Sequence, residues 1–152
     1  MALREMTHSW RRSIGALRIA LATLHLGVAF ISFHRPHLVD LVEGYAGFRE
    51  IAGTTTWGAW ALGIGLGLLL IPRGQPLLIL WQFASAAFFL LFGILVTNGP
   101  AALNWGSGVY GLLGVWSAVL AYATADDWFR MNRWPQRFRA WLAGKWGPRG
   151  GG

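Results

Sequence analysis

Four long apolar segments, separated by short connections, dominate the hydrophobic pattern of this chain. A helix needs about 20 mainly apolar residues to cross a hydrocarbon core about 30 Å thick. The segments that meet this requirement are residues 14–33, 54–71, 77–97 and 105–125, and each connection between them contains proline. Because proline ends helices, we predict an all-α integral membrane protein. Its domain is a bundle of four transmembrane helices over residues 14–125.

The distribution of charge supports a lipid environment. From Gly74 to Ala125 the chain has no Asp, Glu, Lys or Arg. A soluble domain would expose too much apolar surface over such a stretch, whereas a charge at the bilayer centre costs about 2.5–3.5 kcal/mol. The net charge of +7 does not indicate a nucleic-acid partner, because most basic residues lie beside the ends of the apolar segments.

Basic residues gather on one side of the predicted spans. Cytoplasmic loops carry an excess of Lys and Arg, and Trp is enriched at both membrane interfaces. We therefore predict a multi-pass protein of the cytoplasmic (inner) membrane, with residues 1–13, the second loop and residues 126–152 in the cytoplasm. The basic residues that determine this orientation are Arg4, Arg11, Arg12, Arg18, Arg73 and the six that follow the fourth span. The tryptophans expected at the inner boundary are Trp10, Trp81 and Trp128, and those at the outer boundary are Trp57, Trp60 and Trp105.

The first loop contains an amphipathic pattern. Apolar residues recur at helical spacing between residues 37 and 51, with polar residues between them. This pattern predicts a short helix lying in the outer interface. This helix either acts as a functional lid over the bundle or only packs into its entrance.

The tail after residue 125 alternates aromatic and basic side chains. This composition can stack on single-stranded bases, but next to a span it favours anchoring in anionic lipid. We expect anionic lipids of the cytoplasmic leaflet as partners, no nucleic acid, and a disordered end. The residues expected to anchor the tail are Arg130, Arg133, Trp134, Arg137, Arg139 and Trp141.

His25 is the ionisable residue that lies deepest inside a predicted span. At a rise of 1.5 Å per residue, His25 lies about 16 Å from the inner face of the membrane. On the same measure, Ser85 and Ser117 lie about 12 Å from the inner face. With Gln82 these side chains predict a polar layer. The layer could bind a small ligand or relay protons, as intramembrane ionisable groups often do. Alternatively, a neutral histidine hydrogen-bonds a serine and holds the helices together.

Small residues four positions apart mark two predicted contact faces. Gly63 and Gly67 lie in the second span, and Gly111 and Gly114 each belong to such a pair in the fourth. Faces of this kind let helices approach closely. They could mediate assembly of a homo-oligomer, or they could seal the bundle of a single chain.

Several classes of site are not expected. The chain has no cysteine, which excludes disulfides and thiol chemistry. His34, His37 and Asp40 have ligand-like spacing, but Pro36 interrupts the helix that would align them. No carboxylate lies within a span, as a small proton-coupled exporter would require. We expect no metal, no cofactor and no enzymatic activity.

The layout resembles small four-span membrane proteins of actinobacteria and their phages. The segments that carry this resemblance are Arg18 with His25, Phe48–Gly53, Trp57–Trp60 and Gly108–Gly111. Some phage members look like holins, which accumulate in the inner membrane and open it during cell lysis. The layout is also similar to the DoxX-like family of four-helix membrane proteins, whose members have redox or accessory roles.

These resemblances imply two functions. The first is a holin-like protein that acts by self-association through its glycine faces. The alternative is a DoxX-like protein with an accessory or small-ligand-binding role centred on His25. A third possibility, which does not depend on the resemblance, is a structural subunit of a membrane complex.

Overall fold

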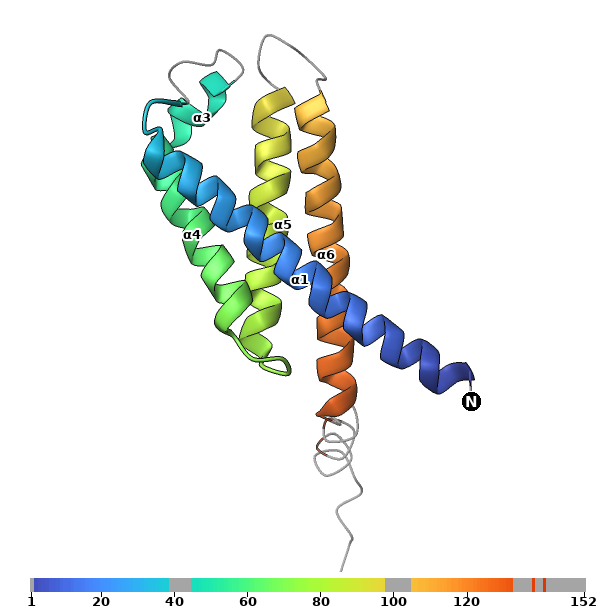
Figure 1. The fold of residues 1–152 in the computed structure, drawn as a ribbon. Coiled ribbons are helices and arrows are strands. Elements are labelled where there is room, and N and C mark those ends of the chain that lie inside the picture. The colour runs from blue at the N-terminus through green and yellow to red at the C-terminus, as the bar shows by residue number, and fades with distance from the viewer. Residues whose placement is uncertain (1, 39–44, 98–104, 133–137, 139–140, 142–152) are drawn as a thin grey trace, which may run out of the picture.

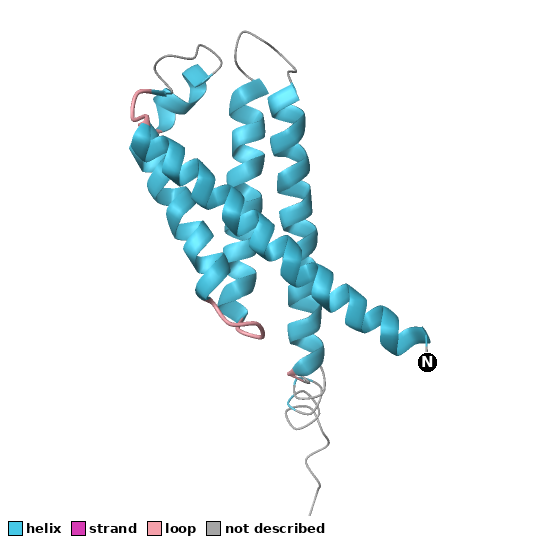
Figure 2. Cartoon of the chain, viewed as in Figure 1, coloured by secondary structure: helices cyan, strands magenta, loops and turns pink. Residues whose placement is uncertain are grey.

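The computed structural model describes residues 2–38, 45–97, 105–132, 138 and 141. Within these ranges the chain is helical and contains no strand (Figures 1 and 2), so the all-α prediction is confirmed for the described residues. The helices are α1 (Ala2–His34), α3 (Ala46–Ile51), α4 (Thr54–Leu70), α5 (Pro76–Thr97) and α6 (Trp105–Met131).

Three helical segments are long and apolar enough to cross a membrane, as judged from length and composition. They are Ser13–His34 with 22 residues, Pro76–Val96 with 21 and Trp105–Met131 with 27. The apolar helix α4 has 17 residues and is about 25 Å long at 1.5 Å per residue. It is therefore shorter than a hydrocarbon core of about 30 Å.

Two helices extend beyond the predicted spans. Helix α1 begins at Ala2, so most of the predicted N-terminal segment 1–13 continues the first helix. Helix α6 ends at Met131, so the predicted tail 126–152 begins as its last turns. Asp126 and Arg130 form an ion pair of 2.8 Å there, at the i, i+4 spacing that favours a helix.

The long helices form two close pairs, α1 with α4 and α5 with α6, which meet each other less closely (Figure 1). Glycines permit the close approach within each pair. A Cβ added at Gly58 in α4 would lie 2.7 Å from the Ser32 Cβ in α1. One added at Gly93 in α5 would lie 3.3 Å from the Gly111 amide nitrogen in α6.

Aromatic side chains fill the wider space between the two pairs. Phe88 and Phe92 on α5 stack with their ring centroids 4.4 Å apart. Phe92 also meets the edge of Trp57 from α4, at 5.2 Å. These rings are buried, and such pairs add about 0.5–1.5 kcal/mol to the effect of burial. The core of the molecule therefore lies between the pairs.

Trp57 is a core residue, which corrects its predicted place in an outer aromatic belt. Its Nε1 donates to the carbonyl oxygens of Phe48, at 3.2 Å, and Ala52, at 3.1 Å. The side chains of Trp57 and Phe48 are both 2% exposed. Helix α3 is thus held over one end of the core. It forms part of the helix predicted over residues 37–51, of which residues 39–44 lie outside the described ranges.

Candidate functional site

Three residues of the predicted polar layer form a chain of hydrogen bonds that joins three helices. The Nε2 atom of His25 in α1 lies 2.8 Å from the Ser85 hydroxyl in α5. That hydroxyl lies 3.1 Å from the Ser117 hydroxyl in α6. All three side chains are fully buried. The structure therefore brings His25, Ser85 and Ser117 together, as their calculated depths predict.

The surroundings of His25 are aromatic and enclosed. Its ring lies 4.5 Å from that of Phe89 and 5.0 Å from that of Phe88, measured between centroids. Its Nδ1 atom is buried and has no hydrogen-bond partner. Neither the cavity nor the groove described below is lined by His25, Ser85 or Ser117. This geometry suits a contact that holds helices together better than a site that a ligand enters.

Gln82, the fourth residue of the predicted layer, has a different environment. It lies nearly one turn before Ser85 on α5 and is 1% exposed. Neither its Nε2 nor its Oε1 atom has a hydrogen-bond partner. Gln82 lines a cavity of about 280 Å³. The structure thus separates the predicted layer into three residues that bond to one another and one buried residue that lines the cavity.

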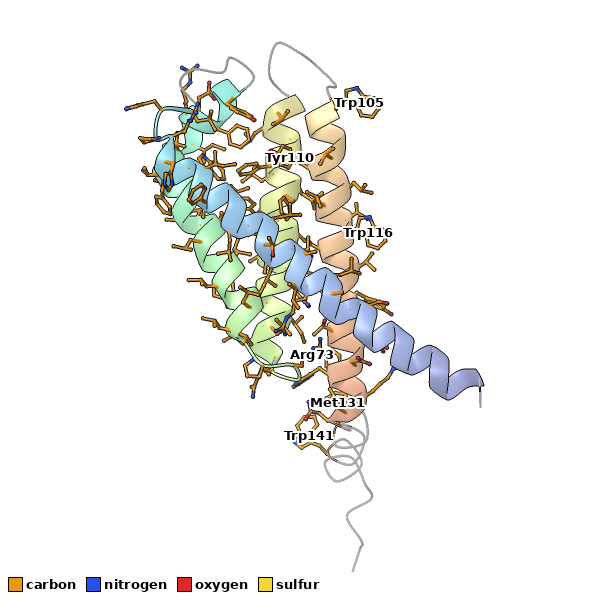
Figure 3. The ribbon with its side chains drawn as sticks, in the orientation of Figure 1. Arg73, Trp105, Tyr110, Trp116, Met131 and Trp141 are labelled. Atoms are coloured by element: carbon orange, nitrogen blue, oxygen red, sulfur yellow. The ribbon has the colours of Figure 1, made fainter. Side chains whose placement is uncertain are left out.

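Four parts of the chain border this cavity. They are α1, the first turns of α5, the end of α6, and the turn between α4 and α5. Arg73 in that turn and Met131 in α6 mark this end of the bundle, which we call the Arg73 end (Figure 3). Tyr110 and Trp105 lie toward the other end of the bundle, the end at which α3 lies (Figures 1 and 3). Besides Gln82, the polar residues that line the cavity are Arg18, Arg73, Gln75, Thr124 and Asp127.

Arg18 connects this cavity to the end of α4. Its Nη1 donates to the Ile71 carbonyl at 3.2 Å, and its Nη2 donates to the Leu69 carbonyl at 3.3 Å. The last carbonyls of a helix lack partners within the helix and carry partial negative charge. Arg18 therefore caps α4 from another helix. The sequence pattern links Arg18 to orientation in the membrane and to the family resemblance, and its position inside an apolar segment is the signal for this further role.

Arg73 shares one wall of the cavity with Arg18. Its guanidinium lies over Gly15, three residues before Arg18 on α1, and occupies the space that a side chain at Gly15 would need. No ion pair or hydrogen bond joins Arg73 to another residue in the described part of the chain. Two guanidinium groups therefore border the same cavity, and Asp127 is the carboxylate among its lining residues.

Three of the four glycines predicted to mediate packing have contacts within the chain. Trp81 lies directly against Gly67. Gly111 meets Gly93, and a Cβ at Gly114 would lie 2.6 Å from Leu90 Cγ. A Cβ at Gly63 or at Gly111 would meet nothing within 4 Å, so Gly111 makes its contact through its backbone, whereas Gly63 has no such contact. It lines an apolar groove of about 480 Å³ between α4 and α5.

The predicted lipid-anchoring residues are described only in part. Arg130 pairs with Asp126, and Trp141 stacks on Phe138 with ring centroids 5.9 Å apart. Arg133, Trp134, Arg137 and Arg139 lie outside the described residues. Anchoring in anionic lipid therefore stays a prediction.

The cavity is the feature that the sequence pattern did not reveal, because its walls come from four separate stretches of the chain. It combines a buried amide, two guanidinium groups and a carboxylate with the apolar side chains of Leu78, Trp128 and Met131. Such a mixture suits a small polar or amphiphilic ligand. Comparisons with protein-family models, with curated proteins and with solved structures give no match for this chain.

Proposed function

We propose that α4 is a fourth span and that the chain is a four-helix protein of the cytoplasmic membrane with both termini inside. Helix α4 is apolar from Trp57 to Leu70 and packs along α1. Its length of about 25 Å is compensated at one end by Arg18, which supplies hydrogen bonds to carbonyls that would otherwise meet lipid. The positive-inside rule then assigns the Arg73 end to the cytoplasm.

This topology can be tested by labelling single cysteines, because the chain has none of its own. We expect Pro72→Cys, in the exposed turn beside Arg73, to react with a membrane-impermeant maleimide only after the cell is opened, and Arg35→Cys to react in intact cells. Reaction of both positions from the same side would contradict four spans.

We further propose that the protein binds a small ligand in the cavity at the Arg73 end, in an accessory role of the DoxX-like kind. The observation that carries this proposal is Gln82, which lines the cavity while both polar atoms of its buried amide lack partners. Leaving a buried polar group unsatisfied costs about 1–3 kcal/mol. An apolar residue would therefore stabilise the bundle better, unless water or a ligand uses the amide.

The polar layer above the cavity supports this assignment. His25, Ser85 and Ser117 bond to one another and are closed off from the cavity. They hold α1, α5 and α6 at a fixed separation, and the cavity lies between the same helices. On this proposal the layer positions the site, and Gln82 contacts the ligand.

The experiment is to identify what the protein retains from its own membrane. The chain is extracted with its surrounding lipid into polymer nanodiscs, and small molecules released by denaturation are quantified by mass spectrometry. We expect one molecule to be enriched over bulk membrane, and Gln82→Leu to lose it. Thr54→Val is the matched control, because the Thr54 hydroxyl is also buried and unpartnered but does not line this cavity.

Each outcome bears on the proposal. Retention by wild type and by T54V, with loss in Q82L at unchanged thermal stability, supports it. The absence of any enriched molecule in wild type contradicts it, as does equal retention by all three proteins.

A holin-like function is the rival proposal, and it requires a surface for self-association. Gly67, Gly111 and Gly114 have contacts within the chain, which favours sealing of the single bundle. Gly63 and Gly111 both leave open space where a Cβ would lie, and Gly63 lines the apolar groove between α4 and α5. Induced expression separates the two functions: abrupt loss of membrane potential supports a holin, and sustained growth at high expression supports a ligand-binding protein. A structural subunit would instead copurify with a partner protein.

A further inference from the structure

We infer that the cavity at the Arg73 end binds an anionic group, a phosphate or a carboxylate, between Arg73 and Arg18. The inference rests on the proposed function and adds the charge class of the ligand. The two cations of the cavity, the N-terminus of α5 and the amide of Gln82 favour an anion there, and one carboxylate opposes it.

The two guanidinium groups border the same cavity beside the first turns of the α1 span. The Arg73 guanidinium lies against Gly15, and Arg18 follows nearly one turn later on the same helix. Arg18 uses two of its donors for the carbonyls of α4, whereas Arg73 has no described partner. Since like charges repel, an anion between them relieves an unfavourable arrangement, and arginine matches the geometry of phosphate and carboxylate oxygens.

The beginning of α5 adds positive potential to the same cavity. Gly74 and Gln75 line the cavity and directly precede Pro76, where α5 begins. The N-terminus of a helix carries about half a positive charge. Gly74 has a φ of 89°, which lets the turn reverse direction while Arg73 stays beside α1.

Gln82 supplies a neutral hydrogen-bonding group deeper in the cavity. Its Nε2 is a donor without a partner, so an oxygen of the bound anion can satisfy it. The amide and the two guanidinium groups thus offer donors from α1, α5 and the intervening turn. The position of Gln82 below the enclosed His25 layer limits how far a ligand can enter.

The carboxylate of Asp127 repels an anion in the cavity and therefore weakens its binding. It lines the cavity from α6. Two guanidinium groups against one carboxylate leave a formal charge of +1 among these groups. We therefore expect neutralisation of Asp127 to strengthen anion binding and neutralisation of Arg73 to weaken it.

The anion has two possible sources with the same chemistry, a lipid headgroup and a free anion. The cavity lies at the end of three candidate spans and includes apolar residues, which suits an amphiphile. It also opens beside the exposed turn at Arg73, which a soluble anion can reach. The experiment therefore needs an arm for each source.

The experiment uses the full chain in phosphatidylcholine nanodiscs and follows thermal unfolding through its tryptophans. One arm replaces part of the phosphatidylcholine with phosphatidylglycerol. The other adds inorganic phosphate, with sodium chloride as the ionic-strength control. The variants are Arg73→Gln and Asp127→Asn, with Arg35→Gln as the control that removes the same charge at the α3 end.

We expect at least one anion to stabilise wild type, and R73Q to need about tenfold more of it, since a charged hydrogen bond contributes about that factor. D127N should need less, and R35Q should behave as wild type. A response to phosphatidylglycerol alone identifies a lipid headgroup, and a response to phosphate identifies a free anion.

Two results would overturn the inference: no stabilisation of wild type by either anion, or equal weakening in R73Q and R35Q, which indicates general surface charge. Its failure is distinguishable from failure of the proposed function. If a neutral molecule is retained through Gln82 while neither anion binds, ligand binding stands and the anionic class is wrong.

Discussion

The Nη1 atom of Arg18 donates a hydrogen bond to the carbonyl oxygen of Ile71, 3.2 Å away and 53 residues along the chain. This contact joins the first helix to the end of α4, the shortest of the four long helices. A helix that ends in or near lipid must find donors for its last carbonyls. The charged side chain of Arg18, inside an apolar segment, therefore supplies hydrogen-bond donors to the backbone carbonyls of a neighbouring helix.

Replacement of Arg18 should loosen the end of α4. Arg18→Met removes both donors, and we expect amide hydrogen exchange at residues 68–71 to increase about tenfold, the factor that corresponds to a bond of about 1.4 kcal/mol. Arg18→Lys keeps the charge and should give a smaller increase. Exchange in the middle of α5 is the internal control, and an equal increase there would indicate general unfolding instead.

Ser85 is the central member of the His25–Ser85–Ser117 chain, so its removal should cost more than removal of either end. We expect Ser85→Ala to lower the free energy of unfolding by about 1 kcal/mol, the scale of a hydrogen bond between membrane helices. Ser117→Ala should cost less, because His25 keeps its partner. If the double variant is as unstable as S85A alone, the chain acts as a unit; full additivity argues against one.

Trp57 should be essential for the attachment of α3. Trp57→Phe keeps an aromatic ring but removes the Nε1 donor to Phe48 and Ala52. We expect a loss of about 2 kcal/mol in stability and faster hydrogen exchange over residues 46–51. Trp60→Phe is the matched control, since Trp60 is half-exposed and should tolerate the change. Similar effects of both substitutions would contradict the core role of Trp57.

The glycines should divide into two groups on substitution by alanine. Gly58→Ala and Gly114→Ala place a Cβ within 3 Å of a neighbouring helix, and we expect each to destabilise the fold by about 1–3 kcal/mol. Gly63→Ala meets nothing and should stabilise α4 slightly, by up to about 1 kcal/mol. Thermal unfolding in detergent measures both. Loss of a defined oligomer in Gly63→Leu would instead support self-association through this residue.

The sequence predicted the helices because lipid imposes a strong and simple constraint on composition. The predicted segments 77–97 and 105–125 lie within α5 and α6, and their limits depend on proline and on long apolar runs. The chain distance from the inner face also placed His25, Ser85 and Ser117 at compatible depths. The depth of a residue in the membrane follows from the rise per residue of its helix. Contacts between polar residues at similar depths can therefore be predicted from the sequence alone.

The direction of each side chain around its helix was less predictable. Trp57 has the composition of an interfacial residue, but the approach of α3 buries it. Gln82 was assigned to the same layer as His25, yet it lines a cavity while His25 is enclosed. Which residues of a helix face a cavity depends on the separation of neighbouring helices, and that separation comes from pairs such as Gly58 and Ser32.

The division of the helices into two close pairs has a consequence for assembly. Each pair is consecutive along the chain, and the pairs are joined by the short turn after Leu70. If α4 spans the membrane, as proposed above, each half can insert as its own hairpin before the aromatic rings meet. We expect two fragments, divided at residue 74 and synthesised separately in one cell, to recombine into a stable complex.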